Sequence, residues 1–70
     1  MQEEAKAVLR DALIREALTL TRESIRLTTM AQMFEDGGHS DMAETTLEIV
    51  RLNDVERIRL RAQIDALEVP

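Results

Sequence analysis

The sequence contains no cysteine, and this absence excludes disulfide bonds and cysteine-ligated metal sites. One histidine is too few for the common histidine-based ligand sets. With 70 residues the chain forms one domain at most, and a compact monomer of this size buries only ~60% of the surface that its unfolded chain exposes. Small proteins that lack disulfides and metals are usually stabilised by association. We therefore expect an oligomer, or a chain that docks on a partner.

Aromatic residues are almost absent, because Phe34 is the only one. Alanine, leucine, arginine and glutamate are frequent instead, and these residues favour helices over strands. Hydrophobic residues make up 44% of the chain and charged residues 33%, a balance typical of folded proteins rather than disordered ones. The composition predicts an all-α fold.

Glycine and proline are confined to one internal point and to the end of the sequence, at Gly37, Gly38 and Pro70. Two uninterrupted stretches predict a first helix over residues 3–35 and a second over residues 41–68, joined by a turn over 36–40. Such a short turn makes the helices antiparallel neighbours. The chain is therefore expected to form a single domain, 1–70, that is an antiparallel two-helix hairpin.

The turn carries residues suited to ending one helix and starting the next. A glycine at 37 or 38 can adopt the left-handed conformation that closes a helix. Ser40 or Asp41 can cap the second helix, with Glu44 placed close to a capping box. Pro70 cannot continue a helix, so the second helix is expected to stop near Glu68.

The net charge is −5, and it is shared by both halves of the chain. Residues 1–36 carry five basic and seven acidic groups, and residues 37–70 carry four and seven. No basic segment is present to attract nucleic acid or an anionic membrane, so both are disfavoured as partners. The sequence shows neither a signal peptide nor a run of ~20 apolar residues, and we expect a cytoplasmic protein without membrane contact.

The first predicted helix has two apolar rows. Leu13, Leu20, Leu27 and Phe34 recur every seven residues, and Ile14, Leu18 and Ile25 form a second row. Between the rows lie small residues: Ala17, Thr21, Ser24, Thr28 and Ala31. This apolar face is wider than the seam of a two-stranded coiled coil, which indicates at least two neighbouring helices. The small residues fit close contact either with the second helix or with another copy of the first.

The second predicted helix also has two rows. One contains Leu47, Val50, Val55, Ile58 and Ala62; the other contains Met42, Ile49, Leu60, Ile64 and Leu67, and is interrupted by Asn53 and Glu56. A single hairpin can bury only one row from each helix. A second copy would close the structure as a four-helix bundle, although a higher oligomer or a helix of another protein satisfies the same need. Asn53 either fixes register inside a seam or lies hydrated at its edge.

These features favour a small non-catalytic protein–protein interaction module with a regulatory, chaperone-like or accessory role. Its expected partners are a second copy, as a homodimer or higher oligomer, and another protein. No catalytic residue, cofactor or metal site is predicted, because there is no cysteine or tyrosine nucleophile and no glycine-rich phosphate loop. The residues expected at the oligomer interface are Leu13, Leu20, Leu27, Leu47, Val50 and Ile58. Those expected to bind another protein are Ile14, Leu18, Ile25, Ile64 and Leu67.

Two alternatives from other classes stay open. The expected hairpin resembles, in shape, the small dimeric RNA-modulating Rop proteins and the hairpin co-chaperones of type III secretion, and shape does not fix function. A Rop-like RNA-binding dimer would use the row Arg15, Arg22 and Arg26. A metal-binding bundle would use carboxylates alone, because the chain has no Glu-x-x-His pair.

Two further groups lie near the turn. His39 stands beside Glu35, Asp36 and Asp41, an arrangement that suits a solvated turn better than a metal site. Met30, Met33 and Met42 form a flexible apolar group that fits either a cap on the core or an adaptable binding surface.

Overall fold

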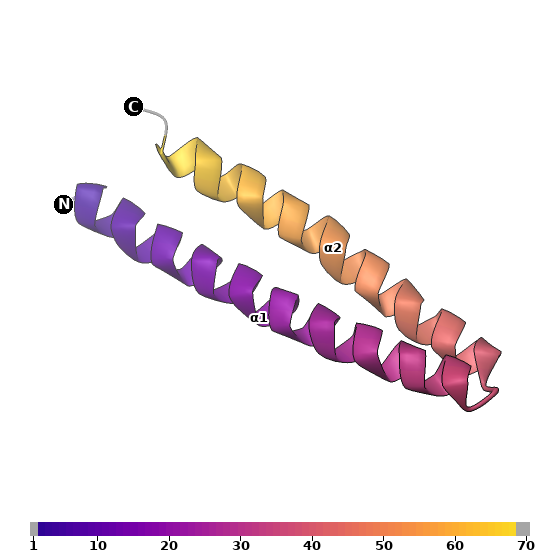
Figure 1. The fold of residues 1–70 in the computed structure, drawn as a ribbon. Helices are drawn as coiled ribbons and strands as arrows, with labels where there is room; N and C mark the ends of the chain where they lie inside the picture. Colours follow the sequence, from indigo (N-terminus) through magenta and orange to yellow (C-terminus); the bar gives the residue numbers. More distant parts are fainter. Residues whose placement is uncertain (1, 69–70) are drawn as a thin grey trace.

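The computed structural model describes residues 2–68 as two antiparallel helices, α1 over Gln2–Asp36 and α2 over Ser40–Glu68 (Figure 1). These bounds lie within one residue of the predicted ones, and the all-α hairpin is confirmed. The molecule is a rod of 55 × 14 × 11 Å. Its radius of gyration is 16.1 Å, whereas a compact domain of this length has about 11 Å.

The chain reverses direction through a glycine-dependent C-cap. Gly38 has φ of +80°, the left-handed region that residues with a Cβ avoid. The amide of His39 donates to the carbonyl of Phe34 at 2.7 Å, and the amide of Gly38 donates to that of Glu35 at 3.1 Å. This pair of bonds is a Schellman motif, which satisfies the carbonyls left free at the end of α1.

The N-cap of α2 differs from the prediction by one residue. The amide of Ala43 donates to the carbonyl of His39 at 3.0 Å, so His39 occupies the N-cap position and Ser40 is the first helical residue. The Schellman motif of α1 already fixes His39, and the next helix therefore begins directly after it. Asp41 lies in the first turn, where its charge suits the helix dipole.

The buried row of α1 follows the predicted seven-residue repeat. Its members are spaced alternately by four and three residues, as in a coiled coil. Ser24 and Ala31 are buried. Since α2 is the one other helix of residues 2–68, this row faces α2, and the small residues contact the second helix within the same chain. The row, half-buried or buried throughout, is Leu13, Ala17, Leu20, Ser24, Leu27, Ala31 and Phe34.

The buried row of α2 is not either of the two predicted rows. It has the same alternating spacing but accepts small and polar residues: Ala43, Thr46, Val50, Asn53, Arg57, Leu60, Ile64 and Leu67. Val55 and Ile58, placed in a predicted row, are 64% and 71% exposed. The cause is geometric. Only residues that recur alternately every three and four positions face the other helix, and Val55 and Ile58 do not occupy those positions. We call the two buried rows together the seam.

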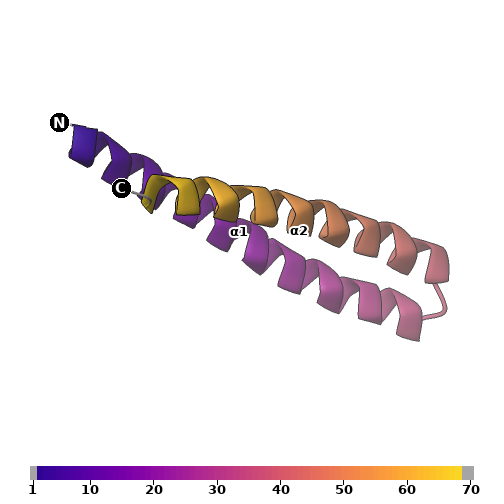
Figure 2. The same cartoon turned by 90° about the horizontal axis from the view of Figure 1, so that it is seen from above.

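The register of the hairpin states which residue of α1 lies beside which residue of α2. It follows from pairing the members of the two buried rows one by one, starting at the turn. Phe34 then lies beside Ala43, Ser24 beside Asn53, and Leu13 beside Ile64. The first two turns of α1, up to Leu9, extend beyond the last described turn of α2, as both views of the ribbon show (Figures 1 and 2).

The hydrophobic core of this rod is very small. Among residues 2–68, the buried hydrophobic residues are Ala31, Ala43 and Leu60. Leu60 is the one large side chain among them, because two helices alone enclose few residues. The seam aligns the helices but hides little apolar surface.

Candidate functional site

The structure divides the predicted oligomer-interface residues into two groups. Leu13, Leu20, Leu27 and Val50 are half-buried in the seam, so part of their surface already contacts the other helix of the same chain. Leu47 and Ile58 lie outside the seam and are exposed. Their role in an oligomer stays a prediction.

The residues predicted to bind another protein divide in the same way. Ile64 and Leu67 are half-buried at the open end of the seam. Ile14, Leu18 and Ile25 are exposed. The exposed members of both predicted groups belong to one side of the hairpin.

That side contains a shallow groove between the helices. Its lining includes Thr21, Ser24, Ile25 and Thr28 from α1, and Val50, Asp54, Arg57, Ile58 and Arg61 from α2. Ile14, Leu18 and Leu47 precede groove residues by seven positions, or two helical turns, and therefore share their face. We call this side the groove face, and its exposed apolar residues are Ile14, Leu18, Ile25, Leu47 and Ile58.

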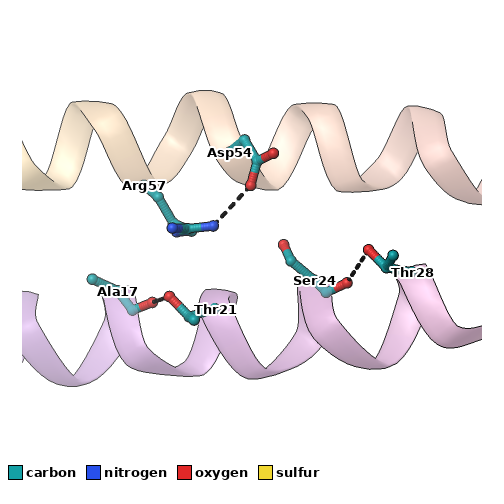
Figure 3. A network of polar contacts seen from close by, with 6 residues as sticks. All are labelled: Ala17, Thr21, Ser24, Thr28, Asp54 and Arg57. Carbon is teal, nitrogen blue, oxygen red and sulfur yellow. Dashed lines mark hydrogen bonds and ion pairs between the residues drawn. The ribbon is translucent and has the colours of Figure 1, made fainter.

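A polar cluster lies in the middle of the groove face. Arg57 reaches from α2 into the space between the helices, and its guanidinium donates to the carboxylate of Asp54 at 2.9 Å (Figure 3). Thr21 and Ser24 lie across from this pair on α1. We use the name polar cluster for these four residues. Both charged side chains keep two-fifths or more of their surface in solvent.

The hydroxyl groups in and beside the polar cluster differ in whether they have a hydrogen-bond partner. Thr21 donates to the carbonyl of Ala17 at 2.9 Å, one turn earlier in α1. Thr28 donates in the same way to the carbonyl of Ser24 at 2.8 Å. The Ser24 hydroxyl, although the residue is only 6% exposed, has no hydrogen-bond partner.

Asn53 has the same property on the other helix. Its Nδ2 atom is buried and lacks a partner, and the register places it in the layer of Ser24. Leaving a buried polar group unpaired costs roughly 1–3 kcal/mol. The centre of the seam therefore holds two polar groups whose hydrogen-bonding needs the single chain does not meet.

The opposite side of the hairpin is organised differently. Near the turn it carries the exposed apolar residues Met30, Met42, Ile49 and Leu52. Toward the open end it carries charged residues, including the ion pair between Glu56 and Arg59 at 3.9 Å. Apart from Leu9, in the first turns of α1 that extend beyond α2, its exposed large apolar residues are thus gathered at one end. Met33 is also exposed near the turn, so these methionines do not form a sealed cap on the core.

The arginine row of the RNA-binding alternative lies on the exposed surface of α1. Arg22 and Arg26 line a hollow together with Glu23. The Nε atom of Arg15 donates to the carbonyl oxygen of Asp11 at 3.4 Å, while the Asp11 carboxylate pairs with Arg10 at 3.9 Å. On α2, Arg61 and Asp65 form an ion pair at 4.0 Å.

Over residues 2–68, no group of three or more histidine, aspartate or glutamate side chains is close enough to hold a metal ion. Neither helix in that range has an apolar stretch long enough to span a membrane.

The predicted sites included neither Asp54 nor Arg57 as part of a functional face. A signal was present, because Arg57 continues the spacing of Ala43, Thr46, Val50 and Asn53 along α2. Counting only large aliphatic residues hides this repeat.

Comparisons of the chain with protein-family models, with curated proteins and with solved structures yield no significant match.

Proposed function

We propose that this protein is a non-catalytic interaction module that works as a homodimeric four-helix bundle, with the groove faces of two hairpins packed together. The observation that carries the proposal is the imbalance of burial. Three hydrophobic residues of the described chain are buried, whereas thirteen large hydrophobic residues are exposed. Contiguous exposed apolar surface on a small protein marks an interaction site.

The surface area supports association of the expected size. The chain exposes 5595 Å², whereas a compact folded monomer of 8.0 kDa exposes about 4,500 Å². The excess is about 1,100 Å². A standard protein–protein interface removes ~800 Å² from each partner, and homodimers often remove more. One dimer interface would therefore bring this chain into the normal range.

In such a bundle the two sides of the hairpin have different tasks. The groove face meets the second copy. The opposite side stays outside and presents its turn-end residues Met30, Met42, Ile49 and Leu52. Methionine side chains adapt to irregular apolar surfaces, so this end would accept an apolar segment of another protein. This division fits a regulatory, chaperone-like or accessory subunit.

The proposal is tested by comparing Ile25→Asp with Leu52→Asp. The two residues are 64% and 66% exposed in the single chain, but Ile25 lies on the groove face and Leu52 on the opposite side. An aspartate buried at an interface would lose its hydration, so Ile25→Asp should weaken dimerisation at least tenfold, while Leu52→Asp should leave it near the wild-type value.

Sedimentation equilibrium on the wild type and both variants gives the measurement. A dimeric wild type, a monomeric Ile25→Asp variant and a dimeric Leu52→Asp variant are expected. A wild-type chain that is folded and monomeric at micromolar concentration contradicts the proposal. Equal dimerisation of both variants would place the interface on another face.

A further inference from the structure

The polar cluster lies at the midpoint of the hairpin. Asp54 is the central residue of α2, with fourteen helical residues on each side. Thr21 and Ser24 are near the middle of the part of α1 that α2 covers. The apolar residues of the groove face flank this centre, with Ile14, Leu18 and Ile58 toward the open end and Ile25 and Leu47 toward the turn.

This arrangement is self-complementary under a two-fold rotation. A two-fold axis that lies in the interface plane and crosses both helices at the cluster brings the turn end of one copy against the open end of the other, with each helix packed on the same helix of the partner subunit. Counting residues from the centre, Leu18 then lies near Ile25 of the partner subunit, and Ile58 lies near Val50 of the partner subunit. The polar centres meet each other, so neither is placed against an apolar patch. Interfaces built on a two-fold axis require this self-matching.

The opposite side of the hairpin lacks this property. Its exposed apolar residues, such as Met42 and Ile49, are at the turn end, and its Glu56–Arg59 pair is toward the open end. The same rotation would place apolar residues against charges, which is unfavourable. Self-association in this antiparallel orientation therefore selects the groove face.

We propose that the polar cluster is the two-fold centre of an antiparallel homodimer, where Arg57 of each copy pairs with Asp54 of the partner subunit. This inference rests on the proposed function and adds the orientation of the copies and the residues that set it. The reciprocal pairs hold only when the two centres coincide. A shifted arrangement leaves charged groups against apolar residues, and a parallel arrangement places each Asp54–Arg57 pair over Thr21 and Ser24 of the partner subunit, without reciprocal charge pairs.

The chemistry of the cluster suits this role. The guanidinium of Arg57 has five N–H donors and the carboxylate of Asp54 accepts up to about four hydrogen bonds, while the pair within one chain uses one bond. Both groups are accessible from the groove. A charge pair at the middle of an apolar interface is a known means of fixing register.

A charge-reversal experiment tests the pairing. D54R makes the cluster doubly positive, and R57D makes it doubly negative, so each variant alone should dimerise at least tenfold more weakly than the wild type. An equimolar mixture should recover dimerisation, because each arginine of one chain then faces an aspartate of the other. The controls E56R and R59E change the net charge equally on the other side of α2, and each should dimerise like the wild type.

Sedimentation and circular dichroism of the single variants and the mixture separate the outcomes. Wild-type dimerisation with D54R and R57D behaving like the controls would overturn the central pairing but leave the homodimer standing. Loss of dimerisation in both variants without recovery in the mixture would also overturn it. A monomeric wild type would instead remove the proposed function itself.

Disulfide trapping tests the orientation separately, and the absence of native cysteine leaves no competing thiol. L18C and I25C are ~10.5 Å apart along α1 in one chain, from the helical rise, and so cannot bond within it. In the antiparallel dimer a mixture of the two variants should form a disulfide between unlike chains. A mixture that dimerises but forms no L18C–I25C disulfide would overturn the antiparallel arrangement.

Discussion

At the scale of single residues, the two glycines of the turn have unequal roles. Gly38 has a positive φ, whereas Gly37 does not. A Cβ at Gly37 would lie 3.3 Å from the Cδ2 atom of His39, a side chain that can shift slightly. A Cβ at Gly38 would meet no atom within 4 Å, so its cost would come from the backbone conformation alone.

We therefore expect Gly38→Ala to lower the free energy of unfolding by about 1 kcal/mol, the cost of placing an L-residue in the left-handed region. Gly37→Ala is the control, and it should change stability by less than about 0.5 kcal/mol, because it also restricts the unfolded chain. Urea unfolding at one protein concentration measures both. Equal losses for the two variants would contradict the assignment of the Schellman motif.

At the scale of the helices, the sequence predicted α1 much better than α2. Leucines every seven residues identified one half of the α1 seam, because there large residues occupy alternate contact positions and small residues lie between them. In α2 those positions hold Thr46, Asn53 and Arg57, while Ile58 and Val55 lie outside them. The groove face also escaped prediction as a unit, because its members come from both helices and their grouping depends on the register. Glycine placement alone was enough for the helix bounds and the turn.

The unequal helix lengths give a prediction about local stability. The first two turns of α1, up to Leu9, have no neighbour within the chain, and Val8 is 68% exposed. In an antiparallel dimer these turns also extend beyond the partner's turn. Short unpacked helical segments fray, so the amides of Ala7, Val8 and Leu9 should exchange with solvent at least tenfold faster than those of Ala17 and Leu20.

Amide hydrogen exchange followed by nuclear magnetic resonance provides this comparison within one sample, with the middle of α1 as internal reference. A parallel dimer would place the two N-terminal segments at the same end of the bundle, where they can pack on each other. Strong protection of these amides would therefore argue against the antiparallel arrangement.

At the scale of the whole molecule, folding and association are expected to be one process. Two helices that bury Ala31, Ala43 and Leu60 gain little from hydrophobic burial, which is the main favourable term in folding. The larger part of the gain would come from the surface between two copies. The stability of such a protein depends on its concentration.

The midpoint of thermal unfolding should accordingly rise as protein concentration is raised from about 1 to 100 μM, a range that changes the association term by roughly 2.7 kcal/mol per dimer. Circular dichroism at 222 nm measures the midpoint. Ile25→Asp serves as the control, because a chain that cannot pair should show a low midpoint that does not move. A wild-type midpoint independent of concentration would mean that the hairpin is stable by itself.

The small apolar surface buried in the seam has a consequence for the turnover of the protein in a cell. A chain that has not met a second copy is held together weakly, so its backbone opens often enough for proteases to cut it. Paired chains would be spared and newly made single chains removed. The amount of this protein would then follow its own synthesis rate steeply: sparse production would leave almost none, and a modest increase would let it accumulate.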